Sequence, residues 1–150
     1  MSKPISIVGL SGSLRAQSFN SALLREAGRL VPEGATFAIA DWSEFPVYND
    51  DVFAKGLPPA LAAVRQQLAD ADAIMICSPE YNYSIPGGLK NAIDWTSRGA
   101  DQPWKGKPVA LAGASMGMLG TARGQYHLRQ VAVFLDAFVL NKPEVMVGKA

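Results

Sequence analysis

Three loops hold the residues of this sequence that are best suited to do chemistry. The first, residues 12–20, reads GSLRAQSFN and sets one guanidinium among hydroxyl and amide side chains, directly before a predicted helix. Such groups bind a terminal phosphate, because the N–H donors and dipole of a helix N-terminus favour an anion and an arginine adds charged donors. We therefore predict a phosphate cradle formed by Ser13, Arg15, Ser18 and Asn20. The alternative is an ordinary turn with serine and asparagine helix caps.

The second loop, residues 79–84, reads PEYNYS and follows a short apolar run. Its tyrosines stand beside a carboxylate and an amide, so this loop can wall a planar ring while its backbone meets the polar edge of a heterocycle. The alternative has equal weight: Tyr81 and Tyr83 pack against the protein and Glu80 fixes the loop.

The third loop, residues 113–117, reads GASMG and matches the Gly-x-Ser-x-Gly nucleophile elbow of serine hydrolases. That chemistry requires an acid and then a histidine after the serine. His127, the one histidine, comes only twelve positions after Ser115 and precedes Asp136 and Glu144, which is the wrong order. We favour a glycine-rich turn that lets the backbone approach a ligand closely.

Composition and charge exclude several classes of function. The chain has 150 residues and a formal net charge of +1, which is no basis for binding nucleic acid or a membrane surface. Its one cysteine, Cys77, rules out an internal disulfide framework, and one histidine leaves little for a soft metal site. No apolar stretch has the length of a membrane span, so the sequence predicts a cytoplasmic protein.

Short apolar runs alternate with helical patterns along the chain. Strands are predicted at residues 5–10, 36–40, 73–77, 109–112 and 145–147. Helices are predicted at residues 20–30, in a segment that begins at residue 58 and in a segment that follows residue 88. A last helix is predicted to carry Leu128, Val131, Leu135 and Phe138 on one face. Residues 41–56 are predicted to be a long loop. The alternation predicts one α/β domain over residues 1–150, a flavodoxin-like three-layer sandwich with a five-stranded parallel sheet of order 2-1-3-4-5. The three loops would then meet at the carboxyl ends of strands one, three and four.

The first two loops together resemble a known family. GSLRxxSxN at residues 12–20 with PEYNYSIPGGLKNAIDW at residues 79–95 is closely similar to the NADPH-dependent FMN reductase family. SMG at 115–117 and YHLRQ at 126–130 resemble its branch of bacterial quinone and chromate reductases. The resemblance covers nearly the whole chain. It implies that FMN binds to the following residues: Ser13, Arg15, Gln17, Ser18, Phe19, Asn20, Pro79, Glu80, Tyr81, Asn82, Tyr83, Ser115 and Gly117.

The resemblance also implies a homodimer or homotetramer in which Arg123, Tyr126 and Glu144 lie near a subunit contact. Family members continue into a further helix after the fifth strand, and we expect that this helix is missing from the present sequence, because its absence would expose part of the sheet.

The function expected from this resemblance is NAD(P)H-dependent reduction of quinones by ping-pong hydride transfer through FMN, with chromate, azo compounds and free flavin as further candidate oxidants. No side chain is nominated as an acid, base or nucleophile, because the flavin supplies the chemistry. The alternatives are a flavodoxin-like electron carrier, which the near-neutral charge disfavours, and a serine hydrolase using Ser115.

Overall fold

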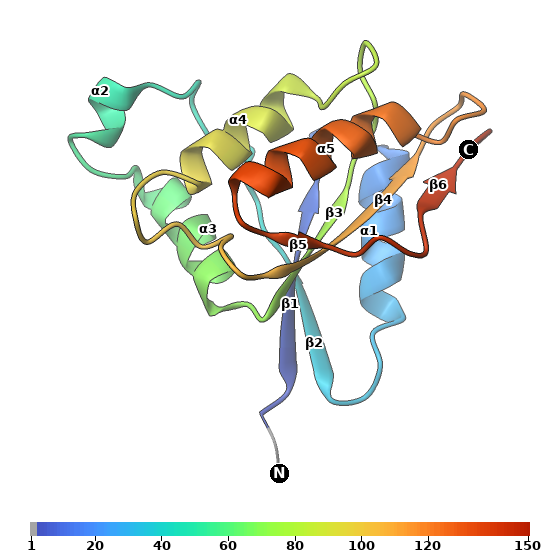
Figure 1. The fold of residues 1–150 in the computed structure, drawn as a ribbon, viewed down its shortest axis with the longest axis horizontal. Coiled ribbons are helices and arrows are strands. Elements are labelled where there is room, and N and C mark those ends of the chain that lie inside the picture. The colour runs from blue at the N-terminus through green and yellow to red at the C-terminus, as the bar shows by residue number, and fades with distance from the viewer. Residues whose placement is uncertain (1–2) are drawn as a thin grey trace.

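The computed structural model describes residues 3–150, in which strands and helices alternate (Figure 1). The strands are β1 (Ile5–Ser11), β2 (Ala35–Ile39), β3 (Ala73–Cys77), β4 (Pro108–Ala114), β5 (Phe138–Val139) and β6 (Val145–Val147). The helices are α1 (Phe19–Arg29), α2 (Asp50–Phe53), α3 (Pro59–Asp70), α4 (Gly87–Thr96) and α5 (Ala122–Phe134). Each predicted strand and long helix is present, with boundaries that differ by only a few residues.

The strands form one parallel sheet of order β2-β1-β3-β4-β5, which confirms the predicted flavodoxin-like topology. The register places Ser11 of β1 opposite Cys77 of β3, and Cys77 opposite Ala112 of β4. β1 and β3 therefore end at one level and β4 continues to Ala114, so the loops that follow the three strands emerge at the same edge of the sheet.

The edge of the sheet differs from the prediction of a single fifth strand. Here β5 pairs with the start of β4 and β6 pairs with its end, so two short segments share the edge position. The placement of Phe138 on the last helix was wrong. The backbone turns left-handed at Asp136, with φ of 55°, which ends α5 after Phe134 and sends Phe138 into β5. No glycine or proline marks this end in the sequence.

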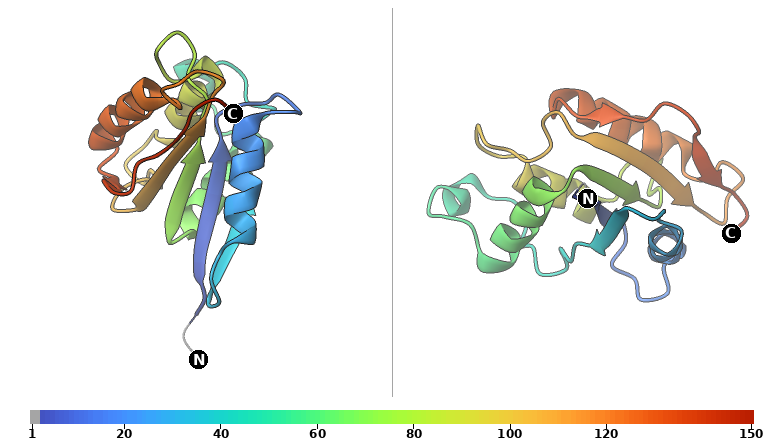
Figure 2. Two further views of the ribbon diagram at one scale, coloured as in Figure 1. Left: turned by 90° about the vertical axis from the view of Figure 1, so that its right-hand side faces the viewer. Right: turned by 90° about the horizontal axis from the view of Figure 1, so that it is seen from below.

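The two faces of the sheet are covered unequally (Figure 2). Helices α3, α4 and α5 pack on one face over a core cluster that includes Leu68, Ile76, Ile93, Leu111 and Leu128. On the other face α1 packs through Leu24 against Cys77 and Ala112. All six of these large aliphatic side chains are at most 6% exposed, and burial of each stabilises the fold by about 1.5–3 kcal/mol.

The long loop between β2 and α3 contains the short helix α2, which the sequence analysis did not predict. The loop is fastened to α4 where the indole N–H of Trp95 donates to the Pro46 carbonyl at 2.8 Å and the Tyr48 ring meets Trp95 edge-on. Trp42, Trp95 and Trp104 are all buried, so the three tryptophans serve the core and its loops.

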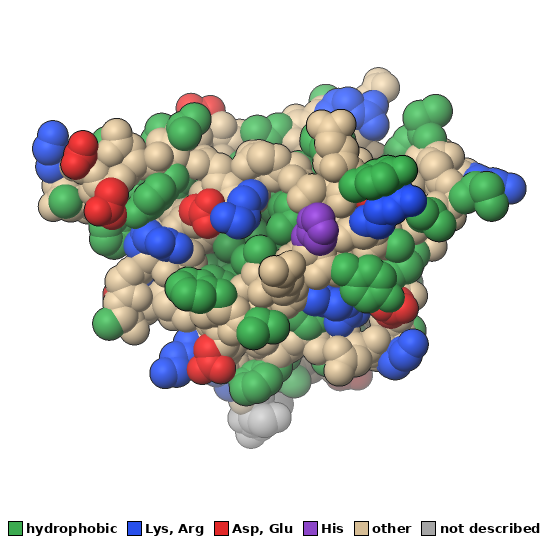
Figure 3. Space-filling view, turned by 45° about the horizontal axis from the view of Figure 1, so that its top comes forward, with side chains coloured by type: hydrophobic (Ala, Val, Ile, Leu, Met, Phe, Trp, Pro, Cys, Tyr) green, Lys and Arg blue, Asp and Glu red, His purple; other side chains and the backbone are tan. Residues whose placement is uncertain are grey.

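Charged side chains of both signs are scattered over the face that carries α4 and α5 (Figure 3). No helix within residues 3–150 combines the length and apolar character needed to cross a membrane.

Candidate functional site

The three loops meet above the ends of β1, β3 and β4. The Ser78 N–H donates to the Ala112 carbonyl at 3.0 Å, which joins the start of the second loop to β4. A methyl group on Gly113 would overlap Oγ1 of Thr121 and lie 2.7 Å from the carbonyl oxygen of Ser78. Only glycine fits there, and its presence brings the second and third loops into contact.

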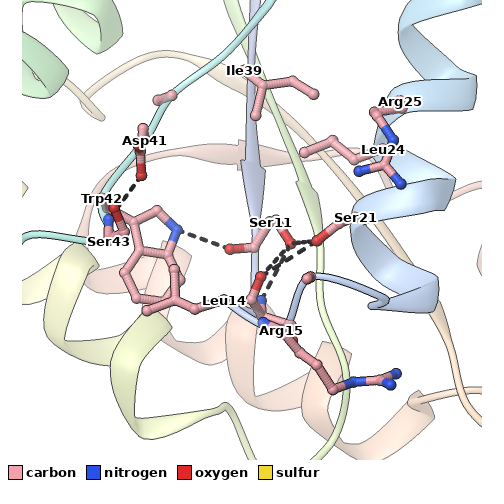
Figure 4. Close-up of a pocket in the computed structure, with 13 residues that line it drawn as sticks. Ser11, Leu14, Arg15, Ser21, Leu24, Arg25, Ile39, Asp41, Trp42 and Ser43 are labelled. Carbon is pink, nitrogen blue, oxygen red and sulfur yellow. Dashed lines mark hydrogen bonds between the residues drawn. The ribbon is translucent and has the colours of Figure 1, made fainter.

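Serine hydroxyls shape the first loop from within (Figure 4). Ser18 caps α1, because its Oγ accepts from the N–H groups of Asn20 and Ser21 at 3.2 and 3.3 Å. The hydroxyls of Ser11 and Ser21 are 2.7 Å apart, and both reach the Ser13 carbonyl. The helix-cap alternative therefore holds for Ser18, whose hydroxyl is engaged within the protein.

Donors that remain free in the first loop are mainly backbone groups. Within residues 3–150, the N–H groups of Ala16, Gln17 and Phe19 have no protein acceptor. The Arg15 guanidinium forms no ion pair in this part of the chain and lies 5.7 Å from the centre of the Phe19 ring. Open N–H groups, a helix N-terminus and an unpaired guanidinium together form a site suited to a phosphate.

The Asn20 side chain is engaged within the protein. It is 2% exposed and forms two hydrogen bonds with the backbone of Ala114, one accepted from the N–H at 2.8 Å and one donated to the carbonyl at 2.9 Å. The amide thus ties the start of α1 to the end of β4.

The second loop contains a tight two-residue turn. Tyr81 and Ser84 exchange two backbone hydrogen bonds at 3.1 and 3.0 Å, and Asn82 and Tyr83 between them have φ of 51° and 65°. Two successive left-handed residues define a type I′ turn, where glycine is preferred at the second position. A tyrosine there is strained, and residues of this kind persist only where the surroundings hold them. The turn presents both tyrosine side chains to solvent, at 51% and 65% exposure.

Helix α5 supplies the contacts that hold this turn. Glu80, with its side chain only 12% exposed, accepts from the Gly124 N–H at 3.0 Å and from the Arg123 guanidinium at 3.4 Å. The guanidinium also stacks 3.7 Å from the centre of the Tyr83 ring. The Ser84 hydroxyl is 2.8 Å from Nδ1 of His127. The Glu80 carboxylate therefore fixes the loop against α5, as one of the two interpretations of this loop predicted. The contact of Glu80 with FMN stays a prediction.

The third loop is fastened to the segment after β6. Ser115 N–H donates to the Val147 carbonyl, and the Lys149 N–H donates to the Gly117 carbonyl. The Ser115 hydroxyl donates to the carbonyl of Gly117 at 3.2 Å, and His127 is engaged with Ser84 instead. Within residues 3–150 the Ser115 hydroxyl forms no hydrogen bond to a histidine or carboxylate side chain, so the arrangement does not support a hydrolase.

A cavity of about 470 Å³ lies between the second and third loops, with Arg123 at its wall. It is lined by Glu80, Asn82, Tyr83, Ser115, Gly117, Met118, Leu119, Thr121 and Arg123. Of the residues predicted to bind a ring, the cavity brings together Glu80, Asn82, Tyr83, Ser115 and Gly117. Met118, Leu119 and Thr121 were missed, although the run of small residues at 113–120 pointed to the loop that carries them.

A second cavity of about 390 Å³ lies on the other side of the first loop, between α1 and the end of β2 (Figure 4). Trp42 lines this cavity, and its indole N–H donates to the Ser11 carbonyl at 2.9 Å. Gln17 and Phe19 are exposed at the tip of the loop, and Pro79 is half-buried at the end of β3.

Titratable groups near the loops have identifiable environments. Burial raises the pKa of the Cys77 thiol to about 12, so Cys77 is a small core residue and not a reactive thiol. A hydrogen bond to Glu144 raises the pKa of the exposed Tyr126 hydroxyl. Within the described residues, no group of three or more His, Cys, Asp or Glu side chains is placed to hold a metal.

Comparison with known proteins matches residues 5–150 to the family described as NADPH-dependent FMN reductase. The chain is 57% identical over 150 residues to NAD(P)H-dependent FMN reductase PA1204 of Pseudomonas aeruginosa, covering 100% of this chain and 81% of that protein. It is 49% identical over 150 residues to a quinone reductase of Escherichia coli, covering 99% and 80%. The solved structure of FerB, a flavoenzyme NAD(P)H:(acceptor) oxidoreductase of Paracoccus denitrificans, superimposes with a TM-score of 0.89 at 33% identity, covering 95% and 79%.

Proposed function

The chain belongs to the NADPH-dependent FMN reductase family, and on this premise we propose that its three loops hold FMN and that it reduces quinones with electrons from NAD(P)H. The protein is an oxidoreductase whose cofactor is FMN and whose electron donor is NAD(P)H. Relatives named as quinone reductases, at 49% identity in Escherichia coli and 43% in a Burkholderia species, support quinones as its oxidants.

The first loop would hold the phosphate of FMN. The N–H groups of Ala16, Gln17 and Phe19, which have no protein acceptor in residues 3–150, support this placement, and Arg15 adds a positive charge without an ion pair there. Ser18 and Asn20 would act indirectly, one by capping α1 and the other by fixing the helix start to β4. The open N–H groups beside Arg15 are the observation that carries the proposal.

The cavity between the second and third loops would hold the ring system. Its volume of about 470 Å³ lies within the range of small-molecule sites, about 300–1,000 Å³. Asn82 and Tyr83 from one wall and Ser115 and Gly117 from the other offer backbone and side-chain polar groups to a heterocycle edge. FMN, when bound there, accepts a hydride from NAD(P)H and delivers electrons to the oxidant.

The remaining proposals rest on the resemblance to the family. Donor and oxidant would occupy the same exposed side in turn, which is a ping-pong scheme, and chromate, azo compounds and free flavin would be further oxidants. Arg123, Tyr126 and Glu144 would lie near a contact in a homodimer or homotetramer. The formal net charge of +1 argues against a one-electron carrier, because such carriers present strongly acidic docking faces.

The test is the visible absorption spectrum of the purified protein with FMN, recorded without oxygen before and after NADPH is added. We expect a flavin band that bleaches with NADPH and returns when a quinone is supplied. For the ping-pong scheme, initial rates measured against NADPH concentration at several fixed quinone concentrations should give parallel double-reciprocal lines. A protein that neither binds FMN nor oxidises NADPH contradicts the proposed function, and intersecting lines contradict the ping-pong scheme alone.

A further inference from the structure

A small set of contacts attaches the turn of the second loop to helix α5. Glu80 precedes the turn and Ser84 ends it, and each makes a contact with α5, at Gly124 and His127 respectively. Arg123, next to Gly124, stacks on the Tyr83 ring in the turn itself. The contacts on α5 span about one helical turn, so the first turn of α5 and the tight turn form one structural unit.

Glu80 supplies the cap hydrogen bond and the negative charge that the start of α5 lacks in its own sequence. The residue at the N-cap position is Thr121, which is left-handed with φ of 72° and makes no side-chain cap bond, and the first turn of α5 has no acidic residue. A helix start leaves N–H donors unpaired and attracts negative charge. The Glu80 carboxylate, arriving from more than forty residues away, accepts from the Gly124 N–H and places a negative charge there.

The tight turn also packs closely against the backbone of Gly124. A methyl group there would lie 3.3 Å from the Ser84 carbonyl oxygen and 3.5 Å from Cβ of Glu80. The helix therefore presents bare backbone to both ends of the tight turn. This close packing holds the turn in which Asn82 and Tyr83 are both left-handed, a conformation that is common for asparagine but rare for tyrosine.

We propose that Glu80 is a positioning residue, which holds the Tyr81–Ser84 turn in the shape that receives the ring system of FMN and thereby couples cofactor binding to order in the first turn of α5. The inference rests on the proposed placement of the ring between the second and third loops. Coupling of this kind is reciprocal: FMN must protect the Gly124 N–H, and loss of the Glu80 contact must weaken FMN binding.

Three variants separate this role from simple stabilisation of α5. Glu80→Ala removes the acceptor of the Gly124 N–H and the partner of Arg123, whereas Glu80→Gln keeps an amide oxygen that can accept from Gly124. Glu26→Ala is the matched control, because Glu26 is a carboxylate ion-paired with an arginine on the exposed side of α1, far from the turn. Each variant is titrated with FMN by flavin fluorescence, at a temperature where the FMN-free protein is folded. Hydrogen exchange at Gly124 is measured with and without FMN.

We expect Glu80→Ala to raise the Kd for FMN at least about tenfold, the equivalent of one lost cap interaction. Glu80→Gln should restore most of the affinity, and Glu26→Ala should bind FMN like the wild type. FMN should slow exchange at Gly124 in the wild type and have little effect on it in Glu80→Ala.

An unchanged Kd in Glu80→Ala, with only a lower unfolding temperature, would show that Glu80 merely stabilises α5 and would overturn the inference. If Glu80→Ala does not fold, the wild-type exchange measurement decides: an FMN complex with unchanged protection at Gly124 also overturns it. Wild-type protein that fails to bind FMN at all would instead contradict the proposed function.

Discussion

Replacing Asn20 by alanine tests how the first and third loops are held together. The substitution removes both hydrogen bonds between the Asn20 side chain and the backbone of Ala114, at 2.8 and 2.9 Å, in a position that is 2% exposed. The Ala114 N–H and carbonyl then lose their side-chain partners inside the protein. An unsatisfied buried polar group costs about 1–3 kcal/mol, so we expect the free energy of unfolding to fall by about 2–4 kcal/mol.

The assay is urea unfolding of the FMN-free protein followed by circular dichroism, with the same denaturant slope required for all variants. Asn49→Ala is the control, because Asn49 also accepts from a backbone N–H but does so at the exposed start of α2. Loss of that cap should cost about 1 kcal/mol or less. Asn20→Asp should also destabilise, because its carboxylate would lie against the Ala114 carbonyl. A loss at Asn20→Ala no larger than at Asn49→Ala would refute the reasoning.

Three further predictions use other contacts. Gly113→Ala should destabilise the protein by more than about 2 kcal/mol in thermal unfolding, because the added methyl overlaps Thr121, and a change below about 1 kcal/mol would contradict that packing. Since burial raises the pKa of Cys77 from 9.0 to about 12, its contribution to stability is complete below pH 9 and is lost as the pH rises toward 12, by up to about 1.4 kcal/mol per pH unit. Urea midpoints of wild type and Cys77→Ala between pH 8 and 10.5 check this, and parallel curves would count against it. Arg15→Ala should weaken FMN about tenfold or more but leave riboflavin, which has no phosphate, unchanged. Arg29→Ala on the exposed part of α1 should alter neither affinity, and an equal loss for riboflavin at Arg15→Ala would remove the phosphate role.

Local patterns in the sequence were enough to predict most of the strands and helices. Short β-branched runs such as residues 5–10 and 73–77 became β1 and β3 nearly as predicted, because apolar runs bounded by glycine and serine have few other ways to be buried. Helix signals with proline at the start placed α3 correctly. Where no glycine or proline marks the end of a helix, the prediction was wrong. Phe138 was assigned to the last helix because nothing in the sequence marks the left-handed turn at Asp136.

The sequence also determined which loops lie together, because the parallel strands β1, β3 and β4 must release their loops at one edge of the sheet. Only the tertiary structure decided what the polar side chains in those loops do. Asn20 meets Ala114 across 94 positions, Glu80 meets Gly124 across 44, and Ser84 meets His127 across 43. Such pairs leave no periodic or local signal, since each partner is chosen by how the helices pack on the sheet. For that reason loop position could be predicted from the sequence, whereas the direction of each side chain could not.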